Sequence, residues 1–367
     1  NTIKIIHQNK TFHLHPIWLR ERLPGEKYFD LDTNQRLYEP SSIDLKLKII
    51  SCNLSDHKLD VEFNDGAQGQ YRLDDLLIEM DEEKNKRGPL PKRILWNSQL
   101  EVIPQAIFEE DMVEKKSMYN LLIDFYKYGF VIIKNVPTES KYILKFVNSS
   151  GPVKVTNFGE FFDVMSKPNP NDLAYKPIAL PPHTDNPYRK PEAPGIQFLH
   201  CLKNEVSGGF STLVDGFSVA EYIKLNEPEA FESLTKTNLR YRFQDKDIIL
   251  ENWGELIELD KDGDYKQVRY STRVDYVPPL ENEKLESFYK ARKLLGDLYT
   301  SSDFEIKFKL SPGDVMMFDN HRLLHGRTSY DSSEGARHLQ GCYLEFDSTD
   351  GKLRHLHEKY HLSETNL

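Results

Sequence analysis

Short segments in which apolar and polar residues alternate run through the first quarter of this chain, as expected for strands that bury one face. Asn, Asp and Gly residues separate these segments, and residues 64–69 have the composition of a hairpin loop. Residues 81–93 are highly charged and punctuated by proline, which is typical of a linker. We therefore predict a small β-rich N-terminal domain over residues 1–95. Its expected strands are TIKIIHQ, LKLKIISCNL, KLDVEFNDG and GQYRLDDLL.

Helical spacing first appears in residues 117–128, where four apolar or aromatic side chains fall on one face. Gly129 follows this segment and is typical of a helix end. The next segment, FVIIKNV, predicts a buried strand. Residues 218–237 and 280–301 also have helical patterns. The four residues on the first helical face are Tyr119, Leu122, Ile123 and Tyr126.

The remainder of the chain is dominated by short strand patterns. Many short strands with a few helices outside them predict a mainly β fold, a sandwich or jelly roll with helical buttresses, over residues 96–367. The expected strands are GIQFLHCL, STLVDG, LRYRFQ, KQVRYST, FEIKFKL, GDVMMFDN and QGCYLEF.

Composition excludes several classes of protein. Of the 367 residues, 38% are hydrophobic, which is ample for a large core, and the net charge of -10 argues against a nucleic-acid or anionic membrane surface. No apolar run approaches the roughly 18 residues of a transmembrane helix. The N-terminal stretch does not resemble a signal peptide. Three scattered cysteines suit a reducing cytoplasm and form no disulfide framework: Cys52, Cys201 and Cys342.

A candidate metal site lies in the segment LPPHTDNPYR. If a strand ends here, His183 and Asp185 point to the same side and can bind one ion. An imidazole and a carboxylate are two ligands of the facial triad that holds non-heme Fe(II). An isolated pair of this kind more often marks a surface turn, so a third ligand is required. We predict His325, because Gly326 beside it allows close backbone approach; His321, four residues earlier, is the alternative.

Arg337 follows His325 by twelve residues, close enough along a strand pair to reach back across such a site. A guanidinium there can bind a dicarboxylate through two parallel hydrogen bonds, although a surface ion pair is the commoner use of an arginine. The Gly-Gly turn in SGGFSTLVDG allows Ser211 or Thr212 to add a hydroxyl. The combination predicts 2-oxoglutarate as co-substrate.

Several motifs together resemble the γ-butyrobetaine hydroxylase branch of the Fe(II)/2-oxoglutarate dioxygenases. The resemblance covers nearly the whole chain. It implies a double-stranded β-helix catalytic domain, Fe(II) bound by the His-Asp-His set, 2-oxoglutarate bound by Arg337, O2 as a second co-substrate, and a homodimer. The motifs are HPIWLRER, ALPPHTDNPYR, GIQFLHCL, GGFSTLVDGF, PGDVMMFDNHRLLHGRTSY and RHLQGCYLEFD.

Relatives in this family act on trimethylammonium compounds. A quaternary ammonium has no N–H group and is best held by aromatic faces, each contributing roughly 0.5–2 kcal/mol. Any one aromatic residue is more often part of a core. The resemblance nevertheless places an aromatic cage on four positions of this chain, all of which are aromatic: Phe158, Phe162, Tyr175 and Tyr343.

The chain departs from the family pattern in two places. The family often binds zinc through closely spaced cysteines just after HPIWLR, but the stretch ERLPGEKYFDLD contains no cysteine, so we expect no structural zinc. The second departure concerns the substrate tail, where family asparagines correspond here to Asp172 and to Ser271 or Thr272. An ionised Asp172 repels a carboxylate unless a cation stands beside it, and Arg273 or Arg189 can supply one.

We therefore expect a cytoplasmic hydroxylase for a γ-butyrobetaine-like substrate. The expected tail contacts leave trimethyllysine and 2-trimethylaminoethylphosphonate as alternative substrates. A catalytically silent quaternary-amine binding protein is the non-enzymatic alternative. The complete set of iron ligands and Arg337 argues against it, because a binder needs no such set.

Overall fold

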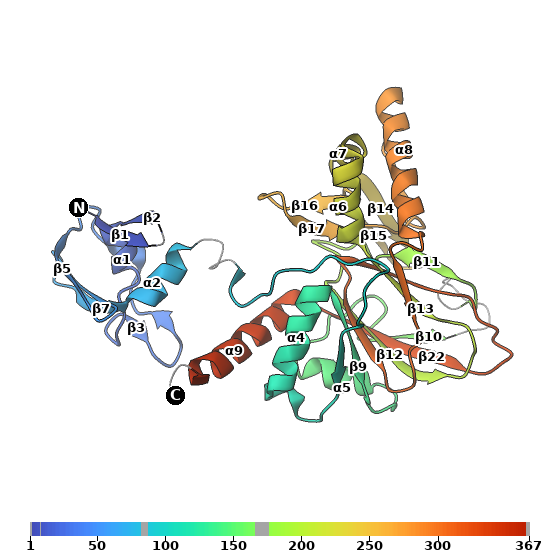
Figure 1. The fold of residues 1–367 in the computed structure, drawn as a ribbon, viewed down its shortest axis with the longest axis horizontal. Coiled ribbons are helices and arrows are strands. Elements are labelled where there is room, and N and C mark those ends of the chain that lie inside the picture. Colours follow the sequence, from blue (N-terminus) through green and yellow to red (C-terminus); the bar gives the residue numbers. More distant parts are fainter. Residues whose placement is uncertain (1, 8, 82–86, 166–175, 365–367) are drawn as a thin grey trace. The chain divides into compact units, whose positions relative to one another are not determined.

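The protein is described by a computed structural model over residues 2–7, 9–81, 87–165 and 176–364 (Figure 1). The chain divides into two compact units, Asn1–Gly88 and Pro89–Leu367, whereas the sequence predicted a boundary near residue 95. The segment just after the division belongs to the second unit because its backbone is bound there. The Ile94 N–H donates to the Lys127 carbonyl, and Arg322 donates to the Ile94 carbonyl.

The described residues of the N-terminal unit form short strands and helices: β1 (Ile3–His7), β2 (Lys10–Leu14), α1 (Pro16–Arg20), β3 (Phe29–Asp30), β4 (Gln35–Arg36), β5 (Ile49–Ser55), β6 (Lys58–Phe63), β7 (Gln68–Arg72) and α2 (Leu73–Met80). Strands β5, β6 and β7 form an antiparallel sheet with β6 in the centre. Alternate residues of β6, Leu59, Val61 and Phe63, are buried in the core of this unit. The predicted hairpin at residues 64–69 connects β6 to β7 and is confirmed.

One predicted strand of this unit is wrong in its second half. The sequence assigned GQYRLDDLL to a single strand, but the chain turns into helix α2 at Leu73. Asp74 and Asp75 lie in the first turn of the helix, where carboxylates interact favourably with the helix dipole. Leu76 is buried against the sheet, so the apolar residues that suggested a strand serve a helix instead.

The second unit contains two main sheets whose neighbouring strands are mostly distant in sequence. This arrangement confirms the predicted jelly-roll class. The larger sheet has the order β10 (Phe162–Met165), β22 (Arg337–Leu344), β12 (Ile196–Asn204), β20 (Val315–Asp319), β9 (Phe130–Lys134) and β8 (Gln105–Ile107). The smaller sheet has the order β11 (Leu180–His183), β21 (Leu323–Arg327), β13 (Ser211–Asp215) and β19 (Glu305–Phe308).

The alternation of side chains along these strands separates two cores. On β20, Met316 and Phe318 face a core between the two sheets, whereas Val315 and Met317 face helices on the outer side. The smaller sheet contributes Leu213 and other inward residues to the same inner core. Both faces of the larger sheet are thus buried, which explains why its strands are continuously apolar in sequence.

Helices cover the outer faces of the two sheets (Figure 1). The larger sheet is covered by α4 (Lys116–Tyr128), α5 (Tyr142–Asn148) and α9 (Phe346–Glu364). The smaller sheet is covered by α6 (Gly216–Asn226), α7 (Pro228–Lys236) and α8 (Asn282–Tyr299). None of the helices in the described part of the chain has the length and apolar character needed to cross a membrane.

The helix predictions succeed in type and differ in detail. Helix α4 ends at Gly129, which has φ 80°, as predicted. Its most buried stripe is Met118, Leu121, Leu122 and Phe125, so the predicted face is rotated toward the helix edge. The single helical segment expected over residues 218–237 is two helices. Proline cannot continue the hydrogen-bond ladder of α6, and Pro228 instead starts α7.

A third sheet lies between β13 and β19 in the chain, and we call it the inserted sheet. It contains β15 (Ile249–Gly254), β14 (Leu239–Gln244) and β18 (Asp275–Tyr276) in that order, and a β16 (Ile257–Leu259) and β17 (Tyr265–Val268) hairpin follows β15. Leu239 and Tyr241 of β14 are buried in the core of helices α6, α7 and α8. This packing brings the end of β14 to the mouth of the jelly roll.

A buried ion pair joins distant parts of the second unit. Arg322 and Asp215 are almost completely inaccessible to solvent and share two hydrogen bonds, of 3.1 and 2.7 Å. The Asp215 carboxylate also accepts from the Trp96 N–H and from the first turn of α6. The pair therefore connects the segment after the domain boundary, the start of β21 and helix α6.

Candidate active site

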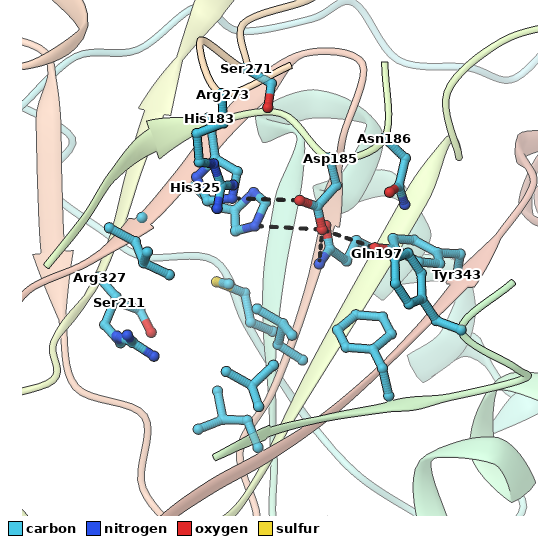
Figure 2. Close-up of a pocket in the computed structure, with 18 of the residues that line it drawn as sticks. His183, Asp185, Asn186, Gln197, Ser211, Ser271, Arg273, His325, Arg327 and Tyr343 are labelled. Carbon is cyan, nitrogen blue, oxygen red and sulfur yellow. Dashed lines mark hydrogen bonds and ion pairs between the residues drawn. The ribbon is translucent and has the colours of Figure 1, made fainter. Parts of the chain in front are cut away.

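A cavity of about 390 Å³ lies between the two main sheets of the second unit. Figure 2 shows that polar side chains point into it from several strands. Its aromatic lining consists of Phe158, Phe162, Tyr188, Phe243 and Tyr343. Its polar lining consists of His183, Asp185, Asn186, Gln197, Ser211, Ser271, Arg273, His325, Arg327 and Arg337.

The two histidines of the predicted metal site come from neighbouring strands. His183 ends β11 and is paired with His325 of β21 in antiparallel register. Their ring centroids are 4.3 Å apart. Asp185 lies two residues beyond His183 and points to the same side, as the HxD spacing predicted (Figure 2).

The distances between the three side chains suit a single metal ion. Nε2 of His183 is 3.5 Å from Oδ1 of Asp185, and Nε2 of His325 is 3.9 Å from Oδ2. One ligand atom from each residue lies within 4.8 Å of the others, which allows all three to reach one ion at bond lengths of about 2 Å. Two imidazole nitrogens and one carboxylate oxygen form the donor set of the Fe(II) facial triad. The residues present therefore fit iron.

The protonation states also suit metal binding. Nδ1 of His183 lies 2.9 Å from the Pro181 carbonyl, which can only accept, so Nδ1 carries the proton and Nε2 keeps its lone pair. Burial and the neighbouring His183 lower the pKa of His325 to about 3. Burial opposes ionisation of Asp185, but His325, His183 and Tyr343 together hold the pKa of that carboxyl well below its usual range. At neutral pH Asp185 is thus ionised and His325 is neutral, so both are ready to bind a cation.

Two side chains from the larger sheet hold the Asp185 carboxylate. Nε2 of Gln197 and the hydroxyl of Tyr343 each donate to Oδ2 over 2.9 Å. Such partners orient metal ligands. The amide of Asn320 also brackets the Asp185 backbone, because its Oδ1 accepts from the Asp185 N–H and its Nδ2 donates to the Asp185 carbonyl. Sequence reasoning missed Gln197, which strand pairing brings here, and Asn320, which lies in the turn between β20 and β21.

His321, the alternative third ligand, lies outside this cluster. Its ring nitrogen Nε2 is 2.8 Å from the Ala193 carbonyl, and the ring packs against Phe346. The structure thus brings His325, and not His321, to His183 and Asp185. The difference follows from strand register, because His325 is the β21 residue opposite His183.

The other end of the cavity carries positive charge. Arg337 begins β22, is 6% exposed and lines the cavity with Ser211 of β13. Burial and the nearby Arg327 lower the pKa of Arg337 to about 10, which leaves it charged at neutral pH. Its Nε has no hydrogen-bond partner among the described residues. A buried, incompletely paired guanidinium is suited to an anionic ligand.

Thr212 is not part of this cavity lining. It follows Ser211 on β13 and points to the opposite face of the sheet, where a Cβ on Gly326 would lie 2.7 Å from its hydroxyl. The prediction offered Ser211 or Thr212, and the structure places only Ser211 at the cavity.

A second arginine, which sequence reasoning did not select, lines the same end. Arg327 is two residues after His325 on β21 and therefore shares its face. Its Nη2 donates to the carbonyls of Lys176 and Ile178. Arg327 and Arg337 both lie over the ring of Tyr330, at 5.1 and 5.5 Å from its centroid. The sequence did contain a signal for Arg327, because residues two apart on a strand share a face and His325 was already a predicted ligand.

Three of the four predicted cage residues line the cavity. Phe162 and Tyr343 face each other with centroids 5.3 Å apart, and Phe158 lies nearer the mouth. Phe158 is 37% exposed, as a residue at an entrance would be. Tyr175 lies outside the described residues.

Two further aromatic residues line the cavity beside Phe158, Phe162 and Tyr343, and we call the five together the aromatic wall. Phe243 of β14 stacks on Tyr188 at 4.9 Å and meets Phe158 edge-on at 5.8 Å. Tyr188 lies in the loop after Asp185, so its place near the site was accessible from sequence. Phe243 was not, because β14 belongs to the inserted sheet and reaches the cavity only through tertiary packing.

The predicted tail contacts are divided. Ser271 and Arg273 line the cavity and Thr272 does not; Ser271 is buried, whereas Thr272 and Arg273 are both exposed. Arg273 is close enough to His325 to help lower the pKa of that imidazole. Arg189, the alternative cation, donates to Asn157 and is absent from the lining. Asp172 lies outside the described residues.

Sequence comparisons identify the family to which the chain is related. Residues 108–343 match the family model described as "Taurine catabolism dioxygenase TauD, TfdA family". The chain is 30% identical to a γ-butyrobetaine dioxygenase of Pongo abelii, covering 97% of this chain and 95% of the relative. It is also 30% identical to the mitochondrial trimethyllysine dioxygenase of Bos taurus, covering 92% of this chain and 82% of the relative.

A solved structure supports the fold assignment. The structure of AAD-2 in complex with Mn(II) and N-oxalylglycine superposes with a TM-score of 0.51. The match covers 69% of this chain and 97% of that protein, at 12% sequence identity. At this identity the likeness concerns the fold alone.

Proposed function

The chain belongs to the TauD/TfdA family of Fe(II)- and 2-oxoglutarate-dependent dioxygenases, and on that basis we propose that it hydroxylates γ-butyrobetaine or a close trimethylammonium analogue. The observation that carries this proposal is a single cavity with three kinds of lining. It combines a His-Asp-His cluster, a buried arginine pair and an aromatic wall.

We assign His183, Asp185 and His325 as the iron ligands. Bound Fe(II), together with 2-oxoglutarate and O2, supplies the oxidising power that inserts oxygen into a C–H bond. The protein keeps His325 neutral and Asp185 ionised, so these two ligands need not lose protons at neutral pH. Gln197 and Tyr343 hold the carboxylate in position.

Arg337 is the proposed partner of the distal carboxylate of 2-oxoglutarate, and Ser211 adds a hydroxyl. Arg327 adds positive charge beside Arg337. Its Nη2 already donates to two backbone carbonyls, so we do not assign that atom to the co-substrate. A planar guanidinium binds a carboxylate through parallel hydrogen bonds, so the co-substrate is oriented as well as held.

The trimethylammonium group of the substrate is placed against the aromatic wall. Phe158, Phe162 and Tyr343 are the predicted cage residues at the cavity, and Tyr188 and Phe243 add two more faces. Their rings attract a cation without hydrogen bonds and exclude water from the reacting carbon. Fixing the cation in this way selects the carbon that is hydroxylated.

Arg273 and Ser271 support an acidic substrate tail. Both line the cavity on the side of His325 (Figure 2). A guanidinium suits the carboxylate of γ-butyrobetaine or a phosphonate, whereas the amino-acid end of trimethyllysine also carries an ammonium group, which a guanidinium repels. The complete ligand set and the buried Arg337 likewise favour an enzyme over a silent binding protein. We also propose a homodimer, as the family resemblance implies, which light scattering can test.

Substrate-stimulated succinate release tests the function. Purified protein with Fe(II), 2-oxoglutarate and O2 is offered γ-butyrobetaine, trimethyllysine, 2-trimethylaminoethylphosphonate or taurine. We expect stimulation by γ-butyrobetaine and a product heavier by one oxygen atom. Stimulation by taurine alone would overturn the trimethylammonium assignment. Turnover with trimethyllysine but not γ-butyrobetaine would overturn the assignment of γ-butyrobetaine as the preferred substrate.

A further inference from the structure

Tyr343 contacts both the aromatic wall and the predicted metal ligand Asp185. Its ring lines the cavity and faces Phe162, so it belongs to the aromatic wall. Its hydroxyl donates to Oδ2 of Asp185 over 2.9 Å, so it also belongs to the support of the metal ligands. Tyr343 is 4% exposed and lies near the end of β22, directly opposite Gln197 of β12, so the side chain has little freedom.

We propose that Tyr343 is a positioning residue that couples the substrate cage to the metal centre through Asp185. This inference rests on the proposed function. A cation against the face of a phenol withdraws electron density from the ring and makes its O–H a stronger donor. The hydroxyl here has a carboxylate as acceptor, so occupancy of the cage is transmitted to the charge and orientation of Asp185.

Gln197 makes the coupling specific to Tyr343. Its Nε2 donates to the same Oδ2 over 2.9 Å, and its side chain is 1% exposed. Gln197 therefore supports Asp185 as Tyr343 does, but it has no aromatic face for a cation. Phe162 is the converse case, since its ring faces Tyr343 across the wall and has no polar atom. Variants of these three residues can therefore distinguish support of Asp185 from contact with the substrate cation.

Metal affinity tests the support role without any turnover. Mn(II) binding is measured by calorimetry on wild-type protein, Tyr343→Phe, Gln197→Leu and Phe162→Leu. Loss of an outer-shell partner typically weakens metal binding by about 10- to 100-fold. We expect losses of this size in Tyr343→Phe and Gln197→Leu, and wild-type affinity in Phe162→Leu. Wild-type Mn(II) affinity in folded Tyr343→Phe would overturn the proposal.

The visible charge-transfer band of the anaerobic Fe(II)–2-oxoglutarate complex tests the coupling. We expect γ-butyrobetaine to shift this band in wild-type protein and in Gln197→Leu, and the shift to be lost in Tyr343→Phe. Because Tyr343→Phe keeps its ring, it should still bind the substrate. An equal shift in Tyr343→Phe would overturn the coupling.

These readouts separate the proposal from the function on which it rests. If γ-butyrobetaine and the other trimethylammonium compounds fail to bind wild-type protein, the proposed function is wrong. If γ-butyrobetaine binds wild-type protein and the shift is unchanged by Tyr343→Phe, only the coupling is wrong. Circular dichroism confirms that each variant is folded, and Gln197→Leu provides an independent test of Asp185 support should Tyr343→Phe not fold.

Discussion

His183 and His325 face each other across β11 and β21 with ring centroids 4.3 Å apart, although they lie far apart in the sequence. The pairing depends on the register of two strands in the smaller sheet. A shift of one residue would turn one imidazole to the opposite face of the sheet. The proposed metal site thus depends on strand pairing, and both sheets contribute to it because Asp185 is supported from the larger one.

Replacing a ligand histidine should abolish metal binding, whereas replacing the neighbouring histidine should not. We expect His183→Ala to lose Fe(II) affinity by more than the roughly 10- to 100-fold typical of outer-shell changes, and to lose turnover. His321→Ala is the matched control. It removes a contact with the Ala193 carbonyl and should cost about 1–3 kcal/mol of folding stability while retaining the metal. Titration calorimetry measures metal affinity, succinate release measures turnover, and urea unfolding measures stability. Activity in His183→Ala would refute its assignment as a ligand.

Arg337→Ala should raise the KM for 2-oxoglutarate by about 10- to 100-fold, because charge-assisted hydrogen bonds contribute about 1.5–3 kcal/mol. Gly209→Ala tests the same guanidinium without removing it. A Cβ there would lie 2.8 Å from Arg337 Nε, on a backbone with φ +68°. Gly263→Ala is the control, since its φ is +87° and nothing lies within 4 Å of the added carbon.

These three variants should rank in a defined order. Arg337→Ala should raise the KM for 2-oxoglutarate most, Gly209→Ala less, and Gly263→Ala not at all. Steady-state kinetics at saturating substrate provides the comparison. An unchanged KM in Arg337→Ala would exclude this residue as the co-substrate anchor.

Phe243→Leu should weaken binding of the trimethylammonium substrate. Loss of one cation–π contact of about 0.5–2 kcal/mol corresponds to a roughly 2- to 30-fold rise in KM. The KM for 2-oxoglutarate should not change, because Arg337 lies at the other end of the cavity. Tyr276→Leu, on β18 of the same inserted sheet but outside the cavity lining, is the control. Equal effects of the two variants would indicate a general disturbance of that sheet.

His200 should make the protein sensitive to acid. Burial lowers the pKa of His200 from 6.5 to about 4, and neither ring nitrogen has a hydrogen-bond partner among the described residues. Between these pH values the unfolded chain binds a proton that the folded chain does not. The contribution to stability is therefore full above pH 6.5 and decreases as the pH falls toward 4, by on the order of 3 kcal/mol.

His200→Leu should flatten this part of the stability curve. Leucine fills a similar volume without a titrating group, so urea unfolding measured from pH 7 to 4 should show a smaller loss of stability than in wild-type protein. The difference between the two proteins should vary little above pH 7. An equal loss of stability in both proteins between pH 7 and pH 4 would show that groups other than His200 cause the acid sensitivity.

The local parts of the fold were predictable because they depend on backbone periodicity. Strand β14 was predicted with its observed ends, and the end of α4 at Gly129 follows from the left-handed conformation that glycine tolerates. The errors also have local causes. Residues 73–77 were assigned to a strand because a short apolar run fits both periods, but they form a helix, which is stabilised by its acidic first turn and its packing.

By itself the sequence determined which residues are available for chemistry and at what spacing: a His and an Asp two apart, a later His, an Arg beyond it, and aromatic residues around them. Only the tertiary structure decided which of these meet. It selected His325 over His321 and Ser211 over Thr212, and it brought Gln197 and Phe243 to the cavity. The reason is physical. Spacing within a strand is set by local geometry, whereas the neighbours of a strand are chosen by burial and pairing over the whole chain.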